Sequence, residues 1–103
     1  MSRVIAVDFD GTLCKDAYPA IGNANMRLIK SLVGNRKNGD KLILWTCREG
    51  KHLQEAVDWC KEHGLEFDAV NENVPELVEK YGSNPRKIGC NLLIDDKSIK
   101  PYW

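Results

Sequence analysis

The chain alternates short apolar runs with segments whose apolar residues recur at helical spacing. The apolar runs have the length and character of strands buried in a sheet, and they cover residues 3–9, 41–46, 66–70 and 90–94. Each helical segment is followed by a glycine that can end a helix, and these segments cover residues 25–33, 51–63 and 74–81. This order predicts a Rossmann-like α/β fold, with a parallel sheet and helices on both faces.

Length and composition indicate one compact unit. The chain has 103 residues, which is enough for one domain and too few for two. Hydrophobic residues make up 43% and charged residues 29%, a balance that favours a packed core under a solvated surface over disorder. The sequence contains no internal repeat, low-complexity tract or linker. We therefore expect residues 1–103 to form a single domain.

Charge and cysteine spacing restrict the partners and the compartment. Fifteen basic and fifteen acidic residues give zero net charge, so no long-range basic field draws the protein to a membrane or to nucleic acid, although charge alone does not exclude nucleic acid. No apolar run approaches the ~20 residues of a membrane span, and the first residues lack the features of a signal peptide. The four cysteines are widely spaced, which favours reduced thiols in the cytoplasm. The sequence leaves open whether the protein is a monomer or an oligomer.

Reactive side chains gather where three of the predicted strands end. Ligands bind beyond the carboxyl ends of the strands in a parallel sheet, and these ends meet at one edge. The three strand ends read Asp8-Phe9-Asp10-Gly11-Thr12, Thr46-Cys47-Arg48 and Asp95-Asp96-Lys97. We therefore expect four carboxylates and a hydroxyl to converge at this edge.

Clustered carboxylates require a cation or a shared proton. A pair of like charges ~4 Å apart costs about 4 kcal/mol at an effective dielectric of 20. A divalent ion such as Mg²⁺ removes this repulsion and accepts a phosphate oxygen, so the expected substrate is an anion that the metal neutralises. Of the two acids Asp8 and Asp10, one can attack phosphorus while the other transfers a proton. Gly11 permits the turn that carries Asp10 over the site, where a proton donor would need a raised pKa.

The motifs at these strand ends resemble those of the haloacid dehalogenase (HAD) superfamily. Its first motif, a strand followed by Asp-x-Asp-Gly-Thr, is matched by residues 8–12. Its second, a Ser or Thr ending an apolar strand, is matched by Thr46, and its fourth, an acidic pair ending another apolar strand, by residues 95–96. The third is a lysine upstream of the fourth, for which Lys87 is the first choice and Lys80 the second. The motifs run from residue 8 to residue 96, which is nearly the whole chain.

The resemblance implies a phosphatase that forms an aspartyl-phosphate and uses Mg²⁺ as its cofactor. Asp8 would be the nucleophile and a metal ligand. Asp10 would be the general acid and then the base that activates water, with its backbone carbonyl on the metal. Thr46 would hydrogen-bond the phosphoryl group, and Lys87 would bind it too while neutralising the charge on Asp8.

Four other residues of the strand ends are also given expected roles. Asp96 is expected as a direct Mg²⁺ ligand and Asp95 as its outer neighbour, and these two assignments can be exchanged. Arg48 is expected either to contact the phosphate or substrate or to make a salt bridge at the start of a helix. Cys47 is expected as a small buried residue, because no Cys-x₅-Arg phosphate loop follows it.

Many members of this superfamily carry a large cap domain, for which the chain has no room between the first two motifs. Only 35 residues, 13–47, join these motifs, and they must hold a helix and a strand. A polar loop with a short flap around residues 14–21 is what is left, so we expect no large cap and an open site. An open site favours a large substrate or a partner that closes over it. The sequence does not determine the class of the phosphorylated substrate.

Three other functions use similar residues. Polynucleotide 3′-phosphatase domains also have an Ile-Asp-Asp sequence followed by a basic residue, and they stay as one alternative. A signalling receiver domain gathers acids, a Thr and a Lys around Mg²⁺, but its acidic pair comes early in the chain. A non-catalytic phosphate-binding module is a third alternative, but the presence of every expected acid argues against it.

Overall fold

A computed structural model describes residues 2–99 and 101. Its elements follow one another as β1 (Val4–Val7), β2 (Cys14–Ala17), β3 (Ala20–Ala24), α1 (Met26–Lys37), β4 (Lys41–Leu44), α2 (Gly50–Glu62), β5 (Ala69–Val70), α3 (Pro75–Tyr81) and β6 (Leu92–Ile94). Within these described residues, no helix combines the length and the apolar character needed to cross a membrane.

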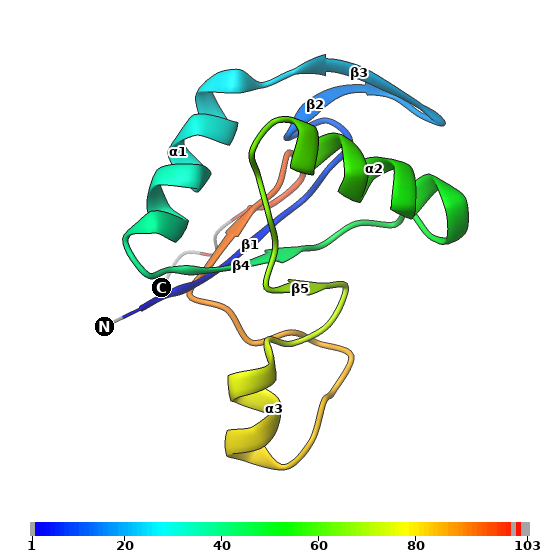
Figure 1. The fold of residues 1–103 in the computed structure, drawn as a ribbon. Coiled ribbons are helices and arrows are strands. Elements are labelled where there is room, and N and C mark those ends of the chain that lie inside the picture. The colour runs from blue at the N-terminus through cyan, green and yellow to red at the C-terminus, as the bar shows by residue number, and fades with distance from the viewer. Residues whose placement is uncertain (1, 100, 102–103) are drawn as a thin grey trace.

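Four strands form a parallel sheet in the order β5-β4-β1-β6. β1 lies between β4 and β6, with Val7 opposite both Leu44 and Ile94. Because the three strands run in the same direction, their carboxyl ends lie at the same edge (Figure 1). The residues that follow β1, β4 and β6 therefore emerge side by side.

Alternate residues of the central strands face two different helical layers. Ile5 and Val7 belong to the larger core, which α1 and α2 cover, whereas Ala6 belongs to a smaller core that includes Val74 and Leu77 beside α3. Figure 1 shows α1 and α2 on one face of the sheet and α3 on the other. The predicted Rossmann-like α/β fold, with helices on both faces, is confirmed.

Helix ends follow local chemistry, with one correction. The Asn25 side chain accepts a hydrogen bond from the Leu28 N–H and begins α1. This helix was expected to stop at Gly34 but continues to Lys37. A glycine inside a helix costs only about 1 kcal/mol, so the helix ends instead beside Gly39, whose φ of 99° no helix interior allows.

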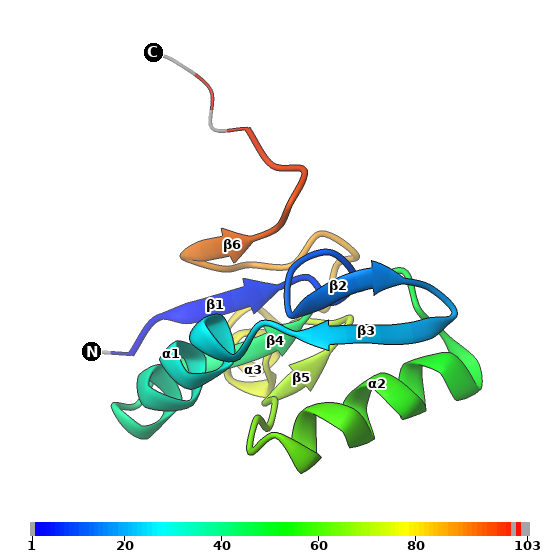
Figure 2. The ribbon, with the colours of Figure 1, turned by 90° about the horizontal axis from the view of Figure 1, so that it is seen from above.

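A second correction concerns the segment after β1, expected as a polar loop. β2 and β3 form an antiparallel hairpin there, with Cys14 opposite Ala24. The hairpin carries exposed Lys15 and Asp16 in place of an apolar run, which is why it does not resemble a buried strand in sequence. It extends from the carboxyl end of β1, and its tip lies beside the start of α2 (Figure 2).

Candidate active site

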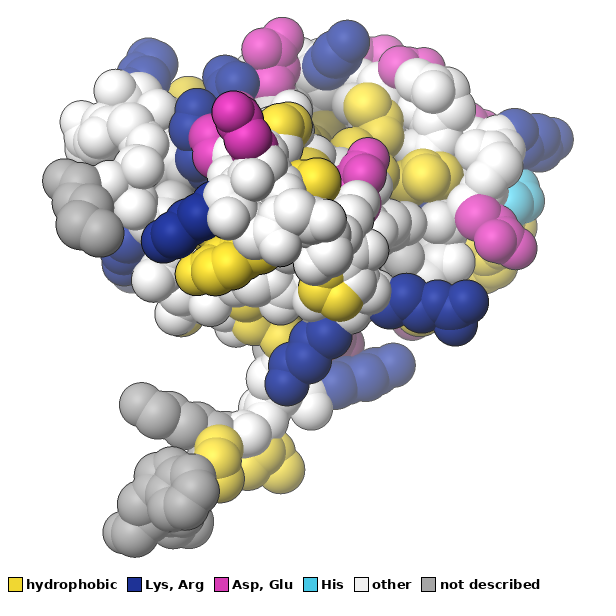
Figure 3. Space-filling model, turned by 90° about the horizontal axis from the view of Figure 1, so that it is seen from below, with side chains coloured by type: hydrophobic (Ala, Val, Ile, Leu, Met, Phe, Trp, Pro, Cys, Tyr) yellow, Lys and Arg dark blue, Asp and Glu magenta, His cyan; other side chains and the backbone are white. Residues whose placement is uncertain are grey.

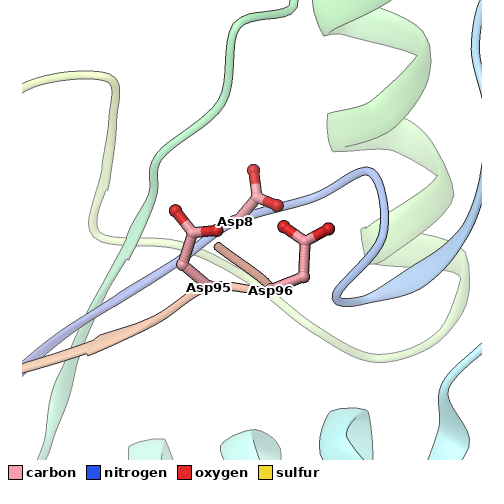
Figure 4. A group of neighbouring side chains, drawn as sticks. All are labelled: Asp8, Asp95 and Asp96. Atoms are coloured by element: carbon pink, nitrogen blue, oxygen red, sulfur yellow. The ribbon is translucent and has the colours of Figure 1, made fainter. Parts of the chain in front are cut away.

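Three carboxylates meet at the carboxyl edge of the sheet. Asp8 follows β1, and Asp95 and Asp96 follow the neighbouring strand β6. One carboxylate oxygen from each lies within 4.8 Å of the other two. The Asp8 N–H donates to the Ile94 carbonyl at 2.9 Å, which extends the pairing of the two strands up to these acids. Figure 4 shows all three side chains pointing to the same side of the sheet edge.

Asp8 lies in a partly buried environment. The Thr12 hydroxyl donates to Asp8 Oδ2 at 3.1 Å and restricts the rotation of the carboxyl group. Burial raises the pKa of Asp8 above its ordinary value, and the charges of Asp95 and Asp96 raise it further, while the hydrogen bonds from Thr12 and the Phe9 backbone act in the opposite direction. An approaching cation would therefore be attracted to a site where negative charge is costly.

Thr46 is held at the end of β4 by backbone and side-chain bonds. Its N–H donates to Asn71 Oδ1 at 2.8 Å, and the Asn71 N–H donates to the Leu44 carbonyl at 2.8 Å. Asn71 has a φ of 55°, a conformation that asparagine tolerates better than most residues. Thr46 Oγ1 accepts from the Arg48 N–H at 3.2 Å, so the proton of this hydroxyl stays available to a ligand.

Asp10 and Arg48 form a bidentate ion pair beside the three acids. Arg48 Nε and Nη2 donate to the two Asp10 oxygens, each at 2.8 Å. The hydrogen bonds to Asp10 raise the pKa of the Arg48 guanidinium, although its burial acts in the opposite direction. Arg48 thus makes a salt bridge, but its partner is an acid of the first motif, whereas a group at the start of the helix was expected.

A cavity of about 360 Å³ brings most of the predicted site together. Its lining includes every predicted acid and both predicted residues at the end of β4, namely Asp8, Asp10, Thr46, Arg48, Asp95 and Asp96. Four further residues line it that the sequence did not assign to the site, namely Asp16, Tyr18, Cys47 and Lys97. The expectation that Cys47 is buried was wrong, because its side chain is exposed at this cavity.

The two lysines proposed for the third motif lie elsewhere. Lys87 lines a separate cavity with Leu77 and Ile88 on the α3 side of the sheet. Lys80 lies in α3, with its Nζ 5.3 Å from the centre of the Tyr81 ring. The structure therefore brings neither lysine to the acids. Lys97, whose position directly after the acidic pair was the available signal, is the lysine that lines the site.

The fold and these residues define an α/β protein with a carboxylate cluster at the carboxyl edge of a parallel sheet. No model of a known protein family and no curated protein matches the sequence. A solved structure of a conserved protein from Bacteroides thetaiotaomicron is similar over 100% of this chain and 84% of that chain, with 39% sequence identity and a TM-score of 0.85. The chain belongs to the same family as that conserved protein. Its description assigns it no activity, so the likeness establishes family and fold alone.

Proposed function

We propose that the chain is a Mg²⁺-dependent phosphohydrolase that transfers the phosphoryl group of a phosphate monoester first to Asp8 and then to water. The observation that carries this proposal is the meeting of Asp8, Asp95 and Asp96 within 4.8 Å, in a cavity that Asp10 and Thr46 also line. The resemblance of the strand-end motifs to those of the HAD superfamily supports the same reaction.

The donor set suits Mg²⁺. Carboxylate oxygens are ligands that this hard cation prefers, and two oxygens on one Mg²⁺ lie at most about 4.2 Å apart, because each is ~2.1 Å from the ion. The carboxylate oxygens of Asp8, Asp95 and Asp96 lie within 4.8 Å, so small side-chain rotations suffice to place them around one ion. These acids and the Asp10 backbone carbonyl would hold it. A bound ion supplies the positive charge that offsets repulsion between the acids and a phosphate.

Asp8 is placed to be the nucleophile. The Thr12 hydroxyl holds Asp8 Oδ2, which leaves Oδ1 to form the bond to phosphorus while the bond from phosphorus to the leaving oxygen breaks. The leaving oxygen keeps the electron pair of the broken bond. The Thr46 hydroxyl donates a hydrogen bond to a phosphoryl oxygen, and Lys97 at the cavity lining adds positive charge.

Asp10 is the group for proton transfer. Each of its oxygens accepts one bond from Arg48 and keeps a second lone pair. Through that lone pair Asp10 takes a proton from the water that attacks the phosphorus of the aspartyl-phosphate, while the bond from phosphorus to Asp8 breaks and returns the Asp8 carboxylate. Because both of its oxygens act as acceptors in the structure, Asp10 is better placed to take a proton from water than to give one to the leaving oxygen. Esters whose leaving oxygen departs without a proton, such as aryl phosphates, should therefore react fastest.

The charges around the cavity favour a substrate with a single phosphate over one with several. Five carboxylates line it, Asp8, Asp10, Asp16, Asp95 and Asp96, against two cationic side chains, Arg48 and Lys97. The face seen from below carries both Lys and Arg and Asp and Glu side chains, so its charge is mixed (Figure 3). A polynucleotide end is thus the less favoured alternative. All four cysteines are free, which supports a reducing compartment such as the cytoplasm.

The proposal is tested by the hydrolysis of an aryl phosphate with and without Mg²⁺. We expect release that depends on the metal and falls on the order of 10³-fold or more in Asp8→Asn, since the nucleophile is removed while the side-chain shape is kept. Asp58→Asn is the matched control, because Asp58 lies on the surface of α2 and accepts a bond from Gln54. Equal release by wild type and Asp8→Asn would overturn the mechanism. No release with any divalent ion would favour a binding or signalling module.

A further inference from the structure

Arg48 is a charged side chain that the fold has enclosed. Only 2% of the residue is exposed, and burial of a cation is costly unless its donors are all satisfied. A guanidinium has five N–H donors, and the structure gives Arg48 five hydrogen bonds. Two of them go to the Asp10 carboxylate and three to backbone carbonyls, those of Pro19, Ala20 and His52.

These bonds join three segments that are distant in the sequence. Asp10 belongs to the turn after β1, Pro19 and Ala20 to the tip of the hairpin, and His52 to the first turns of α2. Figure 2 shows the hairpin tip beside the start of α2. The Arg48 guanidinium bonds a carbonyl of each and so joins the two segments. The rings of Phe9 and Tyr18 each have their centre 5.0 Å from Arg48 Cζ.

This arrangement leaves Arg48 no donor for a phosphate. All five N–H groups are used within the protein, so a phosphoryl group could be bound only by breaking a buried, charge-assisted bond. The bidentate pair instead fixes the plane of the Asp10 carboxyl group. The same guanidinium holds the hairpin tip, and this tip supplies Asp16 and Tyr18 to the cavity.

We propose that Arg48 is the positioning residue of this site, which fixes the Asp10 carboxylate and the hairpin tip as one unit. Arg48 acts on the reaction through Asp10 and does not touch the phosphoryl group. The catalytic part of this inference rests on the proposed phosphohydrolase function, whereas the coupling between Asp10 and the hairpin does not.

A double-mutant cycle in kcat for an aryl phosphate tests the catalytic part. Arg48→Lys keeps the charge but cannot bond Asp10 and the three carbonyls together, and we expect kcat to fall on the order of 10²-fold. In an Asp10→Asn background the same substitution should cost less than about threefold, because the group that Arg48 positions is already disabled. Arg36→Lys is the matched control: Arg36 pairs with Asp68 away from the cavity, and kcat should not change. An Arg48→Lys loss of equal size in both backgrounds would overturn the inference.

Amide hydrogen exchange tests the coupling without using activity. In Arg48→Lys and in Asp10→Asn, the amides of residues 14–24 should exchange at least about tenfold faster, while those of β1 and β4 keep their protection. Asp10→Asn alone carries this test if Arg48→Lys does not fold. Unchanged exchange of the hairpin in Asp10→Asn would overturn the coupling. If the wild type hydrolyses no phosphate ester, the proposed function fails while the exchange result still decides on the role of Arg48 in the fold.

Discussion

Gly11 lies directly against the Asp96 carboxylate. A Cβ on Gly11 would be 3.1 Å from Asp96 Cγ and 2.6 Å from Asp96 Oδ2, and the second distance is closer than such atoms approach in proteins. Gly11 also has a φ of 84°, in the left-handed region, and its N–H donates to the Cys14 carbonyl where the hairpin begins. Gly11 is therefore needed for the turn after β1. It is also needed because a side chain at this position would enter the space that Asp96 occupies.

The first prediction is that Gly11→Ala weakens Mg²⁺ binding. The new methyl group must displace Asp96, so we expect the affinity for Mg²⁺ to fall about 10–100-fold, as for other changes that disturb the orientation of a metal ligand. Gly39→Ala is the control, because Gly39 has a φ of 99° but open space around the added Cβ. Both variants should lose about 1–2 kcal/mol of stability from the left-handed backbone. Titration calorimetry that gives the two variants the same Mg²⁺ affinity would contradict the steric argument.

The second prediction is that Mg²⁺ raises the melting temperature. An ion that binds only the folded protein stabilises it by about 2.7 kcal/mol at 100 times its Kd, which for a chain of this size is about 10 °C or more. Asp96→Asn and Asp8→Asn should each remove most of this rise, and Asp58→Asn should keep it. Differential scanning fluorimetry with a chelator as reference measures the effect. A rise that all three variants share would place the ion elsewhere.

The third prediction concerns pH. Burial and the neighbouring acids raise the pKa of Asp8 in the folded protein, so the folded state keeps this proton to a higher pH than the unfolded chain. At low pH both states are protonated and no penalty arises. As the pH rises through the unfolded and then the folded pKa, stability is lost, and the loss persists at neutral pH.

Asp8→Asn removes this penalty. In the absence of divalent ions it should therefore melt at a higher temperature than the wild type at neutral pH, and the difference should shrink as the pH falls below about 4. Saturating Mg²⁺ should reverse the order of the two proteins. Thermal unfolding in a chelator across this pH range measures the difference. A variant less stable than the wild type at neutral pH would contradict the cause assigned to the raised pKa.

The sequence predicted β1 and β4 because burial leaves a strong local pattern, whereas the expectation that residues 90–94 are buried was wrong: β6 lies at the edge of the sheet, with Leu92 and Leu93 41% and 40% exposed. β1 and β4 are buried on both faces, so nearly every residue in them is apolar. The hairpin leaves no such pattern, because only a few of its residues, such as Cys14, Ile21 and Ala24, pack against the core, and most of the others are exposed. Its tip makes tertiary contacts that the sequence pattern does not show, such as the bonds from Arg48 to the Pro19 and Ala20 carbonyls.

The acids of the site were predictable for a topological reason. Parallel strands end at one edge, so acids that end β1 and β6 must meet wherever those strands are neighbours. The ion pair of Asp10 and Arg48 was not predictable, since it joins positions 38 apart through the placement of a loop. For Lys97, its position directly after the acidic pair was a signal, but spacing along the chain does not state which way a loop turns, so the sequence did not decide between the lysines.

The last prediction assigns the lysine of the site. The Lys97 N–H donates to Asp95 Oδ1 at 2.9 Å, a turn that keeps Lys97 at the cavity, whereas Lys87 lines the cavity beside α3. Lys97→Met should lower kcat/KM for an aryl phosphate on the order of 10²-fold, since a positive charge near the phosphoryl group is lost. Lys97→Arg should recover part of the loss, and Lys87→Met should stay within about twofold of the wild type because its cavity is separate. The opposite result, with Lys87→Met inactive and Lys97→Met unaffected, would mean that the segment carrying Lys87 moves to the acids when substrate binds.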